Sequence, residues 1–130
     1  MGIKIFDTNL EDDDDAITAG PFNLVRDNVR NLTFQVRVNG SGTKDLVGAW
    51  TVGASSDPLV EVDARDGTST AYWTDISSTL TIPAANNGQD EGGLINIASP
   101  GFNWVRLTFT PSSGTDGSVE AWYSFVSAGP

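Results

Sequence analysis

Apolar and polar side chains alternate along several segments of this chain, and the alternation is clearest over Asn31–Val38. In a β-strand, successive side chains point to opposite faces of the sheet, so one face of this segment would be buried and the other would meet solvent. The buried face would consist of Leu32, Phe34, Val36 and Val38, and the other face of Thr33, Gln35 and Arg37. Gly40 and Gly42 follow in a turn-forming stretch, which predicts the end of the strand.

Turn-forming residues separate further short segments that have the composition of strands. These segments are Leu46–Val52, which contains Trp50, and then Leu59–Ala64, Tyr72–Ile76, Leu80–Ile82 and Leu94–Ile97. Small and polar residues over 84–93 predict a loop of about ten residues. With two more strands near the C-terminus, the chain has about eight short strands and no segment with helical periodicity. The sequence therefore predicts an all-β fold, an antiparallel β-sandwich of jelly-roll type.

The segment Phe102–Ser127 has the pattern of two strands joined by the loop Pro111–Gly117, which predicts a hairpin. One face of the two strands is apolar and would join the core. It consists of Val105, Leu107, Phe109, Val119, Ala121, Tyr123 and Phe125. The opposite face carries Trp104, Arg106, Glu120 and Trp122. If Thr110 pairs with Ser118, Arg106 lies across from Trp122, and Glu120 lies diagonal to Arg106.

Three interpretations of this outer face remain open. In the first, the face is a surface cluster in which the guanidinium lies on an indole and reaches a carboxylate. Each such contact would contribute roughly 0.5–1 kcal/mol to the stability of the fold. Tryptophan and arginine are also enriched at binding hot spots, so the face is a candidate subunit interface. Exposed indoles can also stack on sugar rings, and in that case Trp73 joins Trp104 and Trp122, with Asp75 and Arg106 as hydrogen-bonding partners.

The first 21 residues differ in character from the rest of the chain. A short apolar start, Ile3–Phe6, precedes the acidic run Glu11–Asp15 and then Gly20-Pro21. Adjacent carboxylates repel one another, which predicts a flexible or partner-docked acidic arm over residues 1–21, followed by a sandwich domain over residues 22–130. The acidic run is either solvated or a calcium site, since carboxylate oxygens are the ligands that Ca²⁺ prefers, but it lacks the ligand spacing and the glycine of a calcium loop.

The composition excludes several kinds of site. The chain has no Cys and no His, which rules out disulfides, thiolate and His metal sites, and Ser-His-Asp triads within it. Its 17 acidic and 7 basic residues give a net charge of −10, which disfavours binding to nucleic acid or to an anionic membrane. The N-terminus lacks the features of a signal peptide, and no apolar stretch reaches the roughly 18 residues of a membrane helix, so we expect synthesis in a cytoplasm. We expect no enzymatic activity and no cofactor.

Four motifs occur in a characteristic order along the chain. They are NLTFQVRVNG at 31–40, Asp66-Gly67 followed by Tyr72–Ile76, WVRLTF at 104–109 and GSVEAW at 117–122. This order resembles that of small β-sandwich proteins in the particles of tailed bacteriophages, of the type that decorates or cements capsids. The resemblance extends from Phe22 to Phe125.

The resemblance implies a structural and non-enzymatic role in a virion, for a protein that is made in the cytoplasm of the host. The partner would be the capsid protein of the same virus, and the chain would form a homo-oligomer, taken as a trimer by analogy. The alternative function is a carbohydrate- or receptor-binding module of fibre or adhesin type, with the exposed tryptophans as binding residues. Both functions are inferred from fold-level analogy and imply no catalytic residue.

Overall fold

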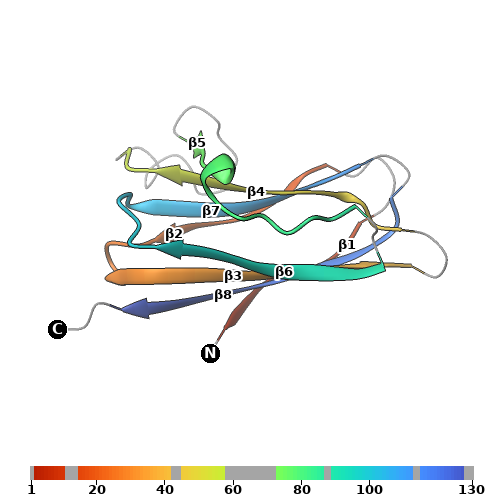
Figure 1. Cartoon of the computed structure of the whole chain (residues 1–130), viewed down its shortest axis with the longest axis horizontal. Helices are drawn as coiled ribbons and strands as arrows, with labels where there is room; N and C mark the ends of the chain where they lie inside the picture. The colour runs from red at the N-terminus through yellow and green to blue at the C-terminus, as the bar shows by residue number, and fades with distance from the viewer. Residues whose placement is uncertain are drawn as a thin grey trace.

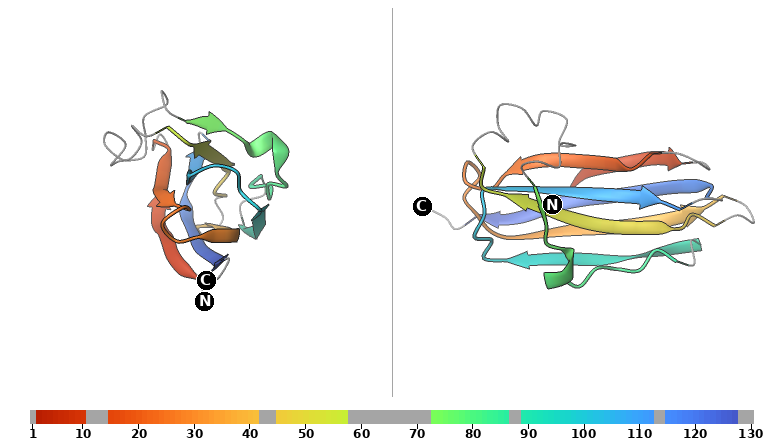
Figure 2. Two further views of the ribbon diagram at one scale, coloured as in Figure 1. Left: turned by 90° about the vertical axis from the view of Figure 1, so that its left-hand side faces the viewer. Right: turned by 90° about the horizontal axis from the view of Figure 1, so that it is seen from above.

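The computed structural model of the chain describes residues 2–10, 15–41, 45–57, 73–86, 89–112 and 115–127. In these ranges, eight strands form two four-stranded antiparallel sheets that pack face to face, so the predicted all-β sandwich is confirmed (Figure 1). The described residues contain one short 3-10 turn, Ser77–Thr79, as their only helical element. Figure 2 shows the sandwich from one end and from above.

Each sheet combines strands that are far apart in the sequence. The first sheet contains, in spatial order, β1 (Ile3–Leu10), β8 (Gly117–Ser127), β3 (Val29–Gly40) and β6 (Gln89–Ala98). The second sheet contains, again in spatial order, β2 (Ile17–Asn23), β7 (Trp104–Pro111), β4 (Gly48–Ser55) and β5 (Thr74–Asp75).

The strands pair as a nested set. β1 pairs with β8, β2 with β7, β3 with β6 and β4 with β5, all antiparallel. The chain thus pairs like one long hairpin, in which the first strand meets the last and the two middle strands meet each other. The β3–β8 and β4–β7 ladders then join these pairs into two sheets. As a result the first and last described strands lie side by side, with Ile3 opposite Tyr123 and Leu10 opposite Gly117.

The inward faces of the two sheets form one core. The alternation predicted for β3 is confirmed, since Leu32, Phe34, Val36 and Val38 are at most 2% exposed. Aromatic rings fill the space between the sheets: the ring centroid of Trp50 lies 4.7 Å from that of Phe109, and the centroid of Phe34 lies 5.5 Å from that of Tyr123. Burial of large aromatic side chains of this kind dominates the stability of a small domain.

The predicted C-terminal hairpin is wrong, although its core face is largely right. β7 pairs with β2 and β4, whereas β8 pairs with β1 and β3, so the two strands belong to different sheets. The predicted core residues from Val105 to Tyr123 are all buried. Alternation identifies which side chains face the core, but both sheets face the same core, so alternation does not identify the neighbouring strand.

Phe125 does not belong to the buried core as predicted. Its side chain points inward by alternation but is 36% exposed. The pairing of β1 with β8 ends at Ile3 and Tyr123, so β1 does not extend along β8 as far as Phe125.

The predicted N-terminal arm is wrong within its described part. Residues 3–10 form β1, where Phe6 and Leu10 are 7% and 3% exposed, and β2 extends across the expected domain boundary at residue 21. The antiparallel partners β8 and β7 supply the hydrogen bonds and the apolar surface that hold these short segments as strands. Residues 11–14 of the acidic run lie outside the described residues, and Asp15 is exposed.

Three other element predictions need correction or lie outside the described residues. Residues 80–82 form no strand and follow the 3-10 turn in an irregular segment. The predicted loop 84–93 is wrong in its second half, because β6 begins at Gln89 and pairs with β3. The predicted strand Leu59–Ala64, the Asp66-Gly67 turn and Tyr72 lie outside the described residues.

Candidate interaction surfaces

The predicted site residues lie on two opposite surfaces of the sandwich. Glu120 and Trp122 face outward from the first sheet, whereas Trp104 and Arg106 face outward from the second, beside Trp73. The predicted pairing of Arg106 with Trp122 is therefore wrong. Trp122 lies opposite Lys4 and Gln35, and Arg106 lies opposite Gly53.

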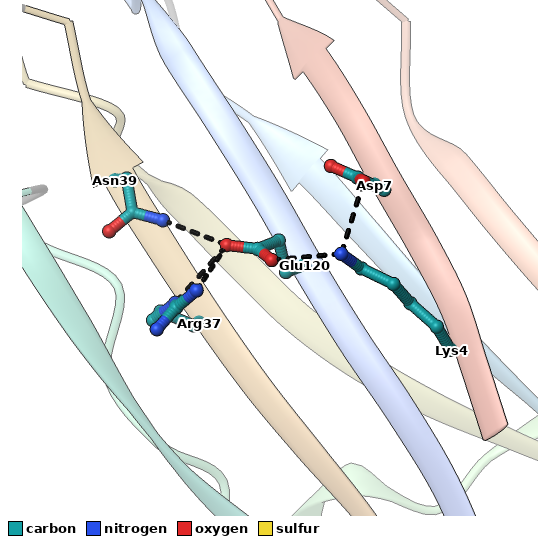
Figure 3. Close-up of polar contacts among 5 residues, drawn as sticks. All are labelled: Lys4, Asp7, Arg37, Asn39 and Glu120. Carbon is teal, nitrogen blue, oxygen red and sulfur yellow. Dashed lines mark hydrogen bonds and ion pairs between the residues drawn. The ribbon is translucent and has the colours of Figure 1, made fainter. Parts of the chain in front are cut away.

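Glu120 is the centre of a polar cluster on the first sheet (Figure 3). Its carboxylate accepts hydrogen bonds from Nε of Arg37 at 3.2 Å and from Nδ2 of Asn39 at 3.3 Å. It also forms an ion pair of 3.1 Å with Nζ of Lys4, which contacts Asp7 at 3.0 Å. The cluster therefore links three neighbouring strands, β1, β8 and β3, across their outer face.

These contacts shift the pKa values of the groups involved. The hydrogen bond from Arg37, followed by the one from Lys4, holds the pKa of Glu120 below its ordinary value. Hydrogen bonding to Asp7, followed by that to Glu120, raises the pKa of Lys4 above its ordinary value of 10.5. The charged forms of both side chains are therefore favoured in the folded protein.

Glu120→Gln is expected to destabilise the protein in a manner that depends on pH. Because the folded-state pKa is lowered, the carboxylate contributes stability above its unfolded-state pKa near 4.5, and this contribution is lost as the pH falls through the folded-state value. The difference in unfolding free energy between wild type and Glu120→Gln should be largest near neutral pH and should shrink in acid. Urea unfolding across about pH 3 to 7 measures this difference.

Asp15→Asn is the matched control for this experiment. It removes one exposed carboxylate that lies outside the cluster. It therefore measures how the loss of any one negative charge changes the free energy of unfolding in a chain of net charge −10. A Glu120→Gln difference that did not vary with pH, or that equalled the Asp15→Asn difference, would contradict the role of the cluster.

Trp122 lies beside the same cations. Its ring centroid is 5.4 Å from Nζ of Lys4 and 5.8 Å from Cζ of Arg37, within the range of cation–π attraction. The predicted combination of indole, cation and carboxylate therefore exists, but its cations come from β1 and β3 rather than from β7. The alternation of β3 already placed Arg37 on an outer face, yet nothing local to the sequence indicated that β3 lies next to β8.

A depression of about 670 Å³ lies on the outer face of the first sheet. Trp122 on β8 and Leu94 on β6 form its sides, and Thr33 and Gln35 on β3 lie between them. Arg37 and Ser124 also line it. The depression therefore combines an aromatic and an aliphatic side with neutral polar groups between them, and Arg37 adds a cation to its lining.

The second sheet carries the other predicted residues, and a smaller depression of about 320 Å³ lies on its outer face beside Trp73 and Arg106. The guanidinium of Arg106 lies over the ring of Trp73, with Cζ 4.6 Å from the centroid. Gly53 leaves room for this stack, because a Cβ at residue 53 would lie 3.1 Å from Nε of Arg106 and 3.4 Å from Cε3 of Trp73. The indole N–H of Trp73 is buried and finds no hydrogen-bond partner among the described residues.

The two sheets differ sharply in charge. Arg106 and Asp75 are the only charged residues in the four described strands of the second sheet. The strands of the first sheet contain seven, namely Lys4, Asp7, Arg30, Arg37, Asp90, Glu91 and Glu120. The outward side chains of the second sheet are mainly threonines and small residues, among them Thr18, Thr51, Thr108 and Thr110.

The described ranges contain no cluster of three or more acidic residues arranged to hold a metal ion. Nor does any helix in those ranges have the length and hydropathy needed to cross a membrane. Comparison of the chain with protein-family models, with curated proteins and with solved structures finds no match.

Proposed function

We propose that this protein is a structural component of a bacteriophage particle, which decorates or cements the capsid through contacts between subunits. The nested strand pairing supports a jelly-roll arrangement, which is common among viral capsid proteins. The partner in this proposal is the capsid protein of the same virus, and the protein itself acts as a homo-oligomer, a trimer by analogy, without enzymatic activity.

The low charge of the second sheet is the observation that carries the proposal. A chain of net charge −10 would be expected to distribute carboxylates over its whole surface, yet Asp75 is the only one in the described strands of this sheet. The centres of protein interfaces are depleted in charged residues and enriched in tryptophan and arginine, as here with Trp73, Trp104 and Arg106.

The size of this face favours repeated contacts over one strong contact. β4 and β7 each have eight residues, which at about 3.3 Å per residue gives a length of roughly 26 Å. Four strands spaced about 4.8 Å apart give a width of roughly 19 Å, and hence an area on the order of 500 Å². A stable interface buries about 800 Å² per partner, so a face of this size suits many weak contacts on a symmetric shell.

Thr51→Arg should abolish binding to the capsid while the fold is kept. Thr51 lies near the middle of the second sheet, in β4, and an added guanidinium there would prevent close approach of a flat partner. Co-sedimentation with virus particles that lack this protein measures binding, and we expect saturable binding of wild type and at least tenfold weaker binding of the variant.

Thr33→Arg is the matched control, since Thr33 is an outward threonine of a central strand in the first sheet. We expect it to bind particles as wild type does. Loss of binding with Thr33→Arg alone would assign the contact to the other sheet, and failure of the wild-type protein to bind any particle would overturn the proposed function. Light scattering on the free protein tests the trimer separately.

A further inference from the structure

We propose that the depression on the first sheet is a binding site for a neutral saccharide. Its volume of about 670 Å³ falls within the range of roughly 300–1,000 Å³ that is typical of small-molecule sites. It lies on the sheet opposite to the proposed capsid contact, so the two surfaces can be occupied at the same time.

The sides of the depression suit the apolar face of a sugar ring. Gln35 lies opposite Trp122 on one neighbouring strand and opposite Leu94 on the other, so an indole and an isobutyl group flank the same position of β3. Leu94 is 50% exposed, which leaves apolar surface open at this edge. The C–H groups on one face of a pyranose can pack on such surfaces, while its hydroxyls remain free at the rim.

The floor of the depression offers neutral hydrogen-bonding groups. The side-chain amide of Gln35 has no partner among the described residues and can both donate and accept. Ser124, opposite Thr33 on β8, adds a hydroxyl of the same dual character, and Thr33 donates its own proton to Oδ1 of Asn96 at 2.9 Å. Sugar hydroxyls also donate and accept hydrogen bonds, so they can pair with both kinds of group. An ionised carboxylate can only accept and an ammonium group can only donate, so each would pair with fewer of them.

The charges around the depression favour an uncharged ligand. Lys4 and Arg37 are the cations that contact the ring of Trp122, and both are already paired with Glu120, while Lys4 also contacts Asp7. These four groups sum to zero charge, so they leave no unbalanced positive charge to attract an anion. The net charge of −10 further repels anionic ligands.

An array of neutral and acidic glycans, followed by titration of any neutral hit, tests this site. We expect wild type to bind a neutral glycan, and Gln35→Ala and Trp122→Ala each to weaken its Kd at least tenfold. Trp122→Phe, which keeps an aromatic face, should weaken it less. Urea unfolding of each variant separates loss of binding from loss of fold.

Thr51→Arg, on the other sheet, is the control that separates this site from the capsid contact. It should bind the glycan as wild type does. The saccharide site is overturned if no neutral glycan binds, if only acidic glycans bind, or if binding survives both Gln35→Ala and Trp122→Ala. None of these outcomes bears on co-sedimentation with particles, so the two proposals fail independently.

Discussion

Phe34→Ala should lower the free energy of unfolding by about 3–5 kcal/mol. Phe34 is fully buried in β3, and its ring centroid lies 5.5 Å from that of Tyr123 and 6.0 Å from that of Phe22. Its removal takes apolar surface out of the core and leaves a cavity between two sheets that cannot collapse freely. Since domains of this size are stable by about 5–15 kcal/mol, the loss would be a large share of the total.

Gln35→Ala provides a matched control, because residue 35 is adjacent in the same strand but points to the opposite face. We expect its unfolding free energy to lie within about 0.5 kcal/mol of wild type. Urea unfolding measures both variants, and Phe34→Leu gives a smaller loss if Phe34→Ala does not fold. Equal effects of Phe34→Ala and Gln35→Ala would show that β3 does not divide the core from the outer face as described.

The double variant Thr33→Cys with Ser124→Cys should form a disulfide spontaneously in an oxidising buffer. Thr33 and Ser124 are direct partners in the β3–β8 ladder, and such partners have Cα atoms about 4.5–5.5 Å apart, within the range of about 4.4–6.8 Å that a disulfide requires. The chain has no Cys of its own, so no other bridge competes. The closed loop is long, and the bridge should stabilise the protein by as much as about 4 kcal/mol.

Arg106→Cys with Trp122→Cys is the corresponding test of the hairpin that alternation alone predicts. Arg106 and Trp122 point outward from opposite sheets, and packed sheets lie about 10 Å apart, so these thiols should stay reduced. Thiol titration and mass spectrometry measure both pairs. A bridge between residues 106 and 122, with none between 33 and 124, would show that β7 and β8 form a hairpin after all.

Local alternation predicted much of the core. Phe34 and Val36, Val105 and Leu107 could be assigned to buried faces from sequence because the two-residue period of a strand is a property of the backbone itself. The same property placed Arg37 on an outer face. Alternation did not predict the exposure of Phe125, which lies beyond the end of the β1–β8 pairing. Nor did it identify Ile3–Leu10 as a strand, because this short segment precedes an acidic run and is held by its pairing with β8.

The candidate sites depended on contacts that are distant in sequence. Alternation identified Trp122 and Glu120 as outward residues. The side chains around them come from three other strands, namely Lys4 from β1, Gln35 from β3 and Leu94 from β6. Arg106 was likewise identified, yet its partner is Trp73 rather than Trp122.

The sequence by itself determined the all-β class, the acidic net charge, the absence of Cys and His, and the face to which most strand residues point. The tertiary structure alone decided which strands are neighbours. It therefore decided that the described strands of the second sheet carry little charge, while the first sheet carries a polar cluster beside its larger depression. The physical reason is that side-chain alternation follows from the geometry of a single strand, whereas the pairing of β1 with β8 or β4 with β7 depends on how the whole chain closes around one core.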